Sequence, residues 1–272
     1  MQAQDPALPG DMYAFIEAGS DALTRARAAV ERGGEGAAIP LSEVRLEAPF
    51  PRPIRNLICV GKNYYEHAHE FDSSGFNKSA SGSAVPEEPI FFTKAPNSVI
   101  GPDAAIPAHN DPTGSTDYEG ELTVVIGAGG RNIPAEKASD HIFGYTIIND
   151  VTARTLQQRH NQWFLGKSVD GFCPMGPAVV TRDEIPDITR SRLQTRVNGE
   201  LRQDTTVSKL IFDIPTLIAT LSRTMTLKPG ELIATGTCAG VGIGFKPPKF
   251  LKPGDVVEIL VDGVGVLSNP VA

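Results

Sequence analysis

The segment DYEGELTVVI, residues 117–126, combines two closely spaced carboxylates with a run of apolar residues. The apolar run predicts a β-strand, and side chains two positions apart on a strand project from the same face. We therefore expect Glu119 and Glu121 to converge on one spot. Adjacent carboxylates repel each other unless a cation lies between them, and oxygen ligands of this kind suit Mg²⁺, Mn²⁺ or Ca²⁺. The alternative is an exposed sheet edge that carries two solvated acids.

A third carboxylate follows the next apolar run, IFGYTII at 142–148, which leads into Asn149 and Asp150. The run predicts a buried strand over 142–149, and the end of such a strand is a common place for a functional site. Asp150 could instead cap a short helix over 152–158, and the two roles are compatible. Three carboxylates would leave positions on a Mg²⁺ ion open for substrate oxygens and water.

A candidate catalytic base lies in the segment GKNYYEHAHE, residues 61–70. If this segment is helical, His67 and Glu70 stand three positions apart on one face, where the carboxylate orients the imidazole and raises its basicity. His69 would then point elsewhere. The alternative is a surface helix with scattered polar residues.

Two further segments could contact an anionic substrate. Lys167 lies among the aromatic residues Trp163, Phe164 and Phe172, so its ammonium group could be partly desolvated beside such a ligand. The glycine-rich turn GTCAGVGIG, residues 236–244, could present backbone amides to a substrate carboxylate. Its glycine spacing does not match GxGxxG, which disfavours a dinucleotide site.

Composition narrows the class of protein. The 272 residues carry a net charge of −7, which argues against nucleic acid as a partner. No apolar run approaches the ~20 residues that would cross a bilayer, and the first residues lack the apolar core of a secretion signal. Three scattered cysteines fit neither a disulfide framework nor a CxxC zinc site, so we expect a cytoplasmic protein. The 27 Gly and 22 Pro favour short strands and tight connections over a helical bundle.

Local patterns predict the organisation of the chain. Residues 11–32 have helical spacing and predict one helix in a small N-terminal segment, 1–50, ahead of a catalytic domain, 51–272. The Ser-, Gly- and Ala-rich stretch 71–88 predicts a loop that could close over a site as a lid. Turn residues and capping residues predict the remaining elements. They are strands at 56–60 and 89–93, hairpin turns at Asn198-Gly199 and Asp262-Gly263, and a helix over 213–222 capped by Asp213.

Several segments in a fixed order carry a resemblance to a known family. They are VGKNYYEHAHE, PIFFTKAPNSVIGP, DYEGELTVVIG, GYTIINDVTAR, GKSVDGFCPMGP, VNGELRQ, GTCAGVGIG and LKPGDVVE. Together they resemble the fumarylacetoacetate hydrolase family from about residue 53 to 270, and especially its small acylpyruvate hydrolase and oxaloacetate decarboxylase type. The resemblance implies a β-rich, mixed-sheet α+β fold of the C-terminal type found in that family, usually paired into a homodimer.

The same resemblance implies roles for individual residues. The metal ligands would be Glu119, Glu121 and Asp150, and the ion would be Mg²⁺ or Mn²⁺. His67 with Glu70 would activate water. Contacts to the substrate would come from three further side chains, namely Gln157, Lys167 and Thr237.

We therefore expect a metal-dependent hydrolase that cleaves a carbon–carbon bond in acylpyruvate-type 2,4-dioxo acids, through an enolate that the ion and Lys167 stabilise. The N-terminal segment is much shorter than the first domain of the large animal enzyme, which argues against fumarylacetoacetate itself as substrate. The alternatives are an oxaloacetate decarboxylase, or an isomerase or hydratase of an unsaturated 2-oxo diacid in aromatic catabolism. A noncatalytic binding protein on the same scaffold is a further alternative.

Overall fold

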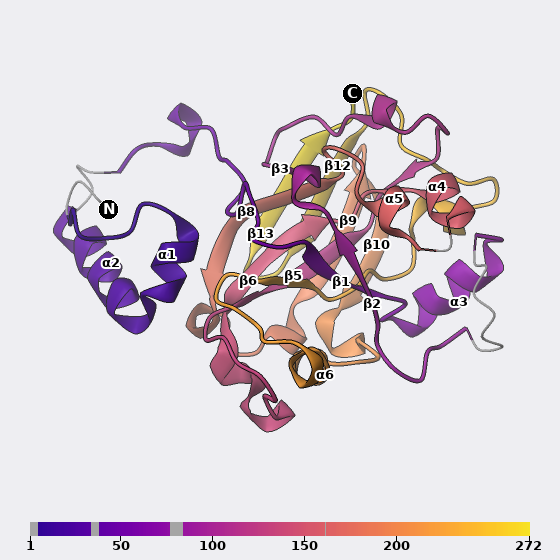
Figure 1. Cartoon of the computed structure of the whole chain (residues 1–272). Helices are drawn as coiled ribbons and strands as arrows, with labels where there is room; N and C mark the ends of the chain where they lie inside the picture. Colours follow the sequence, from indigo (N-terminus) through magenta and orange to yellow (C-terminus); the bar gives the residue numbers. More distant parts are fainter. Residues whose placement is uncertain (1–4, 34–37, 77–83, 161) are drawn as a thin grey trace.

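The fold is a β-rich α+β architecture with mixed strand directions, as expected (Figure 1). The computed structural model describes residues 5–33, 38–76, 84–160 and 162–272. Its strands form a seven-stranded mixed sheet, a four-stranded antiparallel sheet and one short pair. No helix in these described ranges is long and apolar enough to cross a membrane.

The seven-stranded sheet has the order β2-β1-β11-β5-β6-β8-β3. Its members are β1 (Leu57–Gly61), β2 (Ile90–Lys94), β3 (Val99–Ile100), β5 (Gly120–Ile126), β6 (Ile142–Asn149), β8 (Cys173–Thr181) and β11 (Leu232–Ala234). Strand β1 is buried on both faces, because one apolar cluster takes Ile58 and Val60 while the other takes Leu57 and Cys59. Strands β1 and β11 run parallel, so their carboxyl ends meet at one edge of the sheet.

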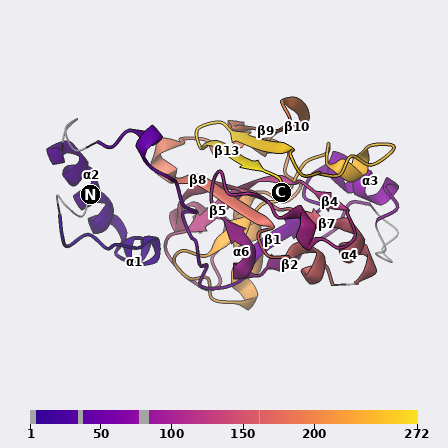
Figure 2. The same cartoon turned by 90° about the horizontal axis from the view of Figure 1, so that it is seen from above.

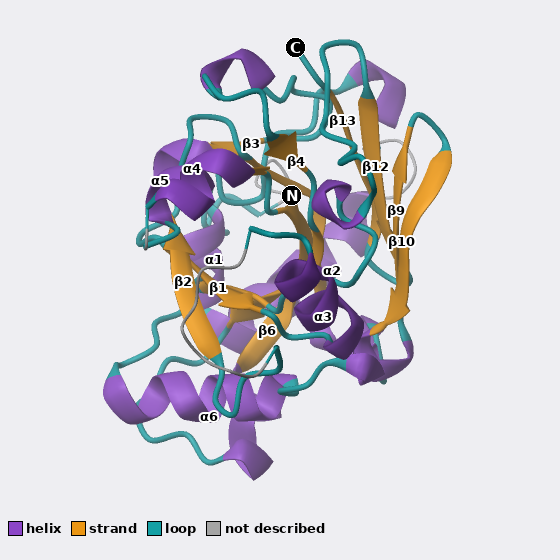
Figure 3. Cartoon of the chain, turned by 90° about the vertical axis from the view of Figure 1, so that its right-hand side faces the viewer, coloured by secondary structure: helices purple, strands orange, loops and turns teal. Residues whose placement is uncertain are grey.

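The four-stranded sheet is built from two hairpins, β9 (Arg192–Val197) with β10 (Glu200–Thr206) and β12 (Val256–Val261) with β13 (Gly265–Pro270). Both predicted hairpin turns are confirmed. Asn198 and Gly199 connect the first hairpin with φ of 52° and 77°, the left-handed values that a tight type I′ turn requires. Figure 3 shows these four strands side by side. The separate pair joins β4 (Thr116–Asp117) to β7 (Thr152–Ala153).

Helices flank the sheets. They are α3 (Tyr65–Ser73), α4 (Arg154–Arg159), α5 (Phe164–Lys167) and α6 (Ile214–Thr224). The predicted cap of α6 is confirmed, since the Asp213 carboxylate accepts a hydrogen bond from the backbone amide of Thr216 at 2.9 Å. Turns of 3-10 helix occupy Leu41–Glu43, Pro96–Ser98, Ala108–Asn110, Ala135–His141, Arg182–Glu184, Ile188–Arg190, Val207–Lys209 and Gly242–Gly244.

The single N-terminal helix predicted over 11–32 is wrong. The segment forms two helices, α1 (Met12–Glu17) and α2 (Gly19–Gly33), because Gly19 adopts a left-handed φ of 65° that ends one helix and redirects the chain. The break lets Ile16 of α1 join the core of the large sheet, while α2 buries Ala26 and Ala29 in a separate small cluster. Figure 2 shows the two helices at one end of the molecule. The division into 1–50 and 51–272 stays a proposal.

The predicted lid lies partly outside the described residues, which resume at residue 84 after Phe76. Its beginning was placed too early, because α3 extends to Ser73. Phe71 is buried against the ring of Trp163, with 5.9 Å between the ring centroids, and this contact continues the helix beyond Glu70. Phe71 is therefore part of the packed structure.

Candidate active site

Three buried carboxylates meet between strands β5 and β6. Glu119 immediately precedes β5, Glu121 lies in it, and Asp150 follows β6. The antiparallel pairing of the two strands places the ends together, and the amide of Asp150 donates to the carbonyl of Glu119 at 2.8 Å. One oxygen from each carboxylate lies within 4.8 Å of the others. The expected convergence is confirmed, and the exposed-edge alternative is wrong because all three residues are buried.

The alternative role of Asp150 as a helix cap is also wrong. The short helix α4 begins at Arg154, later than expected, and its N-cap is Ala153. The two residues before it, Thr152 and Ala153, pair with β4 instead. The Asp150 carboxylate is thus directed into the cluster and not toward the helix.

Buried lysines contact the carboxylate cluster. The ammonium of Lys167 lies 2.7 Å from Glu119 Oε2 and 2.6 Å from Asp150 Oδ2. The ammonium of Lys94, from β2, lies 2.8 Å from Asp150 Oδ1 and donates to the backbone carbonyls of Val151 and Lys167. Burial alone would lower the pKa of Lys167, but Asp150 and Glu119 outweigh it and raise that pKa.

The carboxylates differ in electrostatic environment. Burial raises the pKa of Glu121 well above its usual value, and the charges of Asp150 and Glu119 raise it further. For Glu119, burial would also raise the pKa, but Arg154 and Lys167 outweigh burial and lower it. Three buried carboxylates whose oxygens lie close together are the kind of ligand set that suits a hard divalent cation. The buried triad can therefore bind a divalent metal.

A pH dependence follows from the raised pKa of Glu121. Above about pH 5 an ordinary glutamate is ionised in the unfolded chain, whereas folded Glu121 still holds its proton. The metal-free protein is therefore expected to lose stability as pH rises toward and through the folded-state pKa of Glu121. A bound divalent ion favours the ionised form, so the stabilisation by MgCl₂ should grow over the same range. Thermal unfolding at about pH 6 and about pH 8, with MgCl₂ or with a chelator, measures both trends; equal stabilisation at both pH values would contradict them.

Arg154 and Asp117 support the cluster and were not singled out from the sequence. Arg154 is fully buried and places its guanidinium 2.6 Å from Glu119 Oε1 and 2.9 Å from Asp117 Oδ2. It also donates to the side-chain oxygen of Gln157 at 3.2 Å. Both residues, like Lys94, belong to the family-like segments of the sequence.

Removing the Asp117 carboxylate should destabilise the fold. Asp117→Ala leaves a buried guanidinium with one fewer anion, and breaking a buried ion pair in this way costs about 3–5 kcal/mol. We expect the free energy of unfolding in urea to fall by that order. Asp204→Ala is the matched control, since its ion pair with Arg192 lies at the surface and should contribute much less. Equal effects of the two substitutions would contradict the assigned role of burial.

His67 and Glu70 form the expected pair on α3. Nδ1 of His67 lies 3.2 Å from Glu70 Oε2, and Glu70 Oε1 accepts a hydrogen bond from the amide of Gly240 at 2.9 Å. Glu70 is thereby held in place and can orient the ring of His67, which leaves Nε2 for other contacts. His67 is buried whereas His69 is exposed, so the surface-helix alternative is wrong for His67.

A cleft brings the two groups of residues together. Its lining includes His67 from α3 and the side chains of Glu119, Gln157 and Lys167. Trp163, Phe71, Arg154 and Lys62 complete the wall. The candidate base, one carboxylate of the triad and two of the three residues expected to contact substrate therefore face the same cavity.

Thr237 and the glycine-rich turn have a different environment from the one expected. The Thr237 hydroxyl donates to the carbonyl of Gly120 and accepts from the side-chain amide of Gln203. Several amides of the turn are bound to protein carboxylates: Gly236 donates to Glu121, and Gly242 and Ile243 donate to Asp117. The expectation that this turn offers its amides to a substrate is wrong for these residues, because the carboxylates of Glu121 and Asp117 already accept their hydrogen bonds. A contact of Thr237 with substrate stays a proposal.

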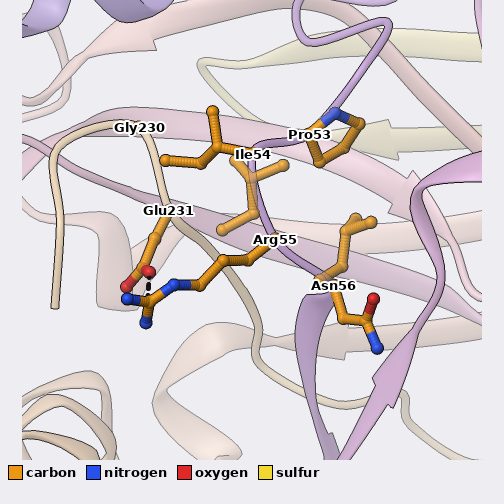
Figure 4. Close-up of a pocket in the computed structure, with 8 residues that line it drawn as sticks. Pro53, Ile54, Arg55, Asn56, Gly230 and Glu231 are labelled. Carbon is orange, nitrogen blue, oxygen red and sulfur yellow. Dashed lines mark ion pairs between the residues drawn. The ribbon is translucent and has the colours of Figure 1, made fainter. Parts of the chain in front are cut away.

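A second pocket lies at the amino-terminal ends of the parallel strands β1 and β11. Pro53 to Asn56 precede β1, and Gly230 and Glu231 precede β11 (Figure 4). Its polar contact is the ion pair between Arg55 Nη1 and Glu231 Oε1 at 2.8 Å. The candidate active site instead lies beyond the carboxyl ends of these parallel strands, where Lys62 and Gly236 follow them. The carboxyl ends of parallel strands are the usual position for a ligand site.

Comparison with known proteins agrees with this arrangement. The family model of the fumarylacetoacetate hydrolase C-terminal domain matches residues 56–272. The chain belongs to the fumarylacetoacetate hydrolase family. The relatives of this chain within the family are named as enzymes, and the protein is an enzyme of this family.

Relatives within this family carry different activities in their names. The oxaloacetate tautomerase YisK of Bacillus subtilis is 52% identical over 231 residues, which are 85% of this chain and 74% of the relative. A solved fumarylacetoacetate hydrolase from Exiguobacterium antarcticum is 43% identical with a TM-score of 0.78, covering 99% of this chain and 90% of that one. A 5-carboxymethyl-2-hydroxymuconate delta-isomerase from Mycobacterium smegmatis is 42% identical with a TM-score of 0.70, covering 86% and 84%.

Proposed function

We propose that this enzyme moves a proton at the carbon next to the 2-oxo group of a small 2-oxo acid, and that oxaloacetate is a substrate. The observation that carries the proposal is that His67, oriented by Glu70, lines the same cleft as Glu119 and Lys167. A base, a buried cation and a metal-binding carboxylate thus surround one cavity. The name of the 52% identical relative supports the choice of oxaloacetate.

The residues of the chain supply the steps of a keto–enol conversion. Neutral His67 accepts a proton from C3 of the substrate through Nε2, and Glu70 stabilises the resulting imidazolium. The electron pair of the C–H bond forms the C2–C3 double bond, and the negative charge moves to the 2-oxo oxygen. Lys167 stabilises this charge with its buried ammonium. The proton on His67 then returns to that oxygen and gives the neutral enol, so the reaction is balanced.

Glu119, Glu121 and Asp150 would hold Mg²⁺ or Mn²⁺, and a bound ion would supply Lewis-acid polarisation of the substrate oxygens. Two structural observations support these ligands: all three carboxylates are buried, and one oxygen from each lies within 4.8 Å of the others. Arg154 keeps Glu119 in place through a 2.6 Å ion pair. Gln157 accepts a hydrogen bond from Arg154 and lines the cleft, which supports a contact between its side chain and the substrate.

Carbon–carbon hydrolysis of an acylpyruvate is the second candidate. The same His67–Glu70 pair could remove a proton from water instead of from carbon. That water would attack the distal carbonyl carbon, and the carbon–carbon bond would then break to release a carboxylic acid and leave a pyruvate enolate. The solved fumarylacetoacetate hydrolase, which covers 99% of this chain at 43% identity, supports this candidate. Decarboxylation of oxaloacetate would use the enolate without an attacking water, and isomerisation of an unsaturated 2-oxo diacid would use only proton movement.

A substrate panel tests these candidates. The purified enzyme with MgCl₂ would be given oxaloacetate, an acylpyruvate and an unsaturated 2-oxo diacid. Enol formation is followed by ultraviolet absorbance, and cleavage by the release of pyruvate or carbon dioxide. We expect the fastest rate for oxaloacetate tautomerisation. Fast acylpyruvate cleavage with no acceleration of tautomerisation would favour the second candidate, and no turnover of any of the three would overturn the proposed function.

Two further proposals concern the state of the protein. We propose a homodimer, as the family resemblance implies, and light scattering after size-exclusion chromatography would show a mass of twice the 29.0 kDa chain. We also propose a cytoplasmic location, which the three buried and free cysteines support because such thiols fit a reducing compartment.

A further inference from the structure

The second half of the glycine-rich turn, residues 240–244, holds the carboxylate that orients the candidate base. The backbone amide of Gly240 donates to Glu70 Oε1 at 2.9 Å, while Glu70 Oε2 lies 3.2 Å from Nδ1 of His67. The two oxygens of Glu70 therefore have different partners, one in the turn and one on the base. Because a side chain is held in one orientation by the hydrogen bonds of its supporting residues, the turn controls where Oε2 meets the ring of His67.

Gly244 lets Glu70 approach this turn closely. A Cβ atom at position 244 would overlap the Glu70 carboxylate, whose Oε1 and Cδ would be its nearest neighbours. Gly244 does not have a left-handed φ, so a glycine is needed there for space and not for backbone conformation. The buried side chains of Val241 and Ile243 also pack in one apolar cluster with Phe71 of α3. The turn and the helix that bears the base thus form one packed unit.

The same turn is bound to the segment that carries the proposed metal ligands. The Tyr118 hydroxyl donates to the carbonyl of Gly240 at 2.8 Å. The buried Asp117 carboxylate accepts a hydrogen bond from the amide of Gly242 at 2.7 Å. Both residues directly precede Glu119 in the sequence. The turn therefore joins the helix of the base to the carboxylate side of the site.

The hydrogen bond from His67 to Glu70 decides which ring nitrogen can act as a base. A neutral imidazole carries one proton, and a carboxylate beside Nδ1 favours the tautomer with that proton on Nδ1. Nε2 then has a free lone pair and can accept a proton from the substrate. Without an acceptor beside Nδ1 the proton can occupy Nε2 instead, and this tautomer cannot accept a proton there. The placement of Glu70 therefore controls the fraction of the enzyme that is ready to react.

We propose that the turn at 240–244 is a positioning element, which holds Glu70 so that His67 keeps its proton on Nδ1 and leaves Nε2 free. The Gly240 amide supplies the hydrogen bond, and Gly244 supplies the space. For this role the turn needs no contact with substrate. The inference rests on the proposed function in one respect, the role of His67 as the base. The tautomer of His67 is a property of the folded protein that can be measured without turnover.

Gly244→Ala tests the proposal with two readouts, both taken in the presence of MgCl₂. At about pH 8 an ordinary histidine is largely neutral, and nitrogen NMR of labelled protein then distinguishes its two tautomers. We expect the wild type to carry the proton on Nδ1 of His67, and the variant to shift toward the Nε2 tautomer because the added methyl group displaces Glu70. Turnover should fall about 10- to 100-fold, a part of the ~10²–10⁴-fold that a general base contributes. KM should stay near the wild-type value, since the lost interaction acts in the transition state.

A double substitution separates positioning from general damage to the turn. In Glu70→Ala the carboxylate is absent, so the further change Gly244→Ala should lower turnover no more, and the two effects should be strongly non-additive. Gly129→Ala is the matched control. A Cβ atom there would lie 2.6 Å from the backbone carbonyl oxygen of Leu227, and neither residue lines the cleft. This variant crowds the chain as well, but it should leave the tautomer of His67 and the turnover of the folded protein unchanged.

Tyr118→Phe is a second variant, which keeps the ring and removes the hydroxyl that donates to the Gly240 carbonyl. It should shift the same tautomer balance, by less than Gly244→Ala does, and it decides alone if Gly244→Ala does not fold. An unchanged tautomer of His67 in these variants would overturn the proposal. Equal loss of turnover on Gly244→Ala with and without the Glu70 carboxylate would also overturn it. The expected tautomer shift in an enzyme that converts no 2-oxo acid would support the positioning role and count only against the proposed function.

Discussion

His67→Ala is expected to lower the turnover of oxaloacetate or an acylpyruvate by about 10²–10⁴-fold, the usual contribution of a general base. The KM should change little, because the carboxylates of the proposed metal site and Lys167 remain. Metal uptake measured by calorimetry should also be retained, since His67 contacts Glu70 and is not a member of the carboxylate triad. The substitution thus separates proton transfer from binding.

The neighbouring histidine of the same helix supplies the control. His69 is two residues away on α3 but is exposed, so His69→Ala should retain normal turnover. Glu70→Gln should give an intermediate loss, because the amide can still orient the ring but cannot stabilise a positive charge on it. If His67→Ala kept more than about a tenth of the wild-type rate, His67 would not be the base.

Glu121→Gln is expected to lower turnover by more than about 100-fold. Replacing a residue that merely supports a metal ligand typically costs 10- to 100-fold in affinity or activity, so loss of a ligand should cost more. The amide has nearly the same shape as the carboxylate, so the fold should be retained. Calorimetry with MgCl₂ should show that metal uptake is lost or strongly weakened.

Stability of the metal-free protein provides a separate measurement for this variant. Burial and the neighbouring carboxylates raise the pKa of Glu121, so its ionised form is disfavoured without an ion. At neutral pH, Glu121→Gln should therefore leave the free energy of unfolding of the metal-free protein unchanged or increase it. Glu66→Gln, at an exposed position of α3, is the control with normal metal uptake. Normal uptake by Glu121→Gln would remove Glu121 from the proposed ligand set.

Local patterns were sufficient for much of the architecture. Strand β6 has the predicted bounds, both hairpins turn at the predicted Asn-Gly and Asp-Gly pairs, and Asp213 caps α6. These features depend on interactions within a few residues, such as turn geometry and the alternation of side chains along a strand. For the same reason the convergence of Glu119 and Glu121 followed from their spacing alone.

Contacts between distant segments could not be read in this way. The break at Gly19 places α1 on the large sheet, and a helical pattern in isolation contains no information about that surface. The amides of Gly240 and Gly242 bind Glu70 and Asp117, which lie more than 100 positions earlier in the chain. Whether the backbone amides of a turn are free to bind substrate therefore depends on residues that lie far away in the sequence.

The amino-acid sequence by itself determined the family-like order of segments, the strand and hairpin positions, and the residue types of the site. The tertiary structure decided which charges meet: Lys94 with Asp150, Arg154 with Asp117, and Lys62 with the ring of Phe71. The physical reason is that burial and pairing of a charge depend on groups that folding brings from elsewhere, whereas strand and turn preferences depend on neighbouring residues.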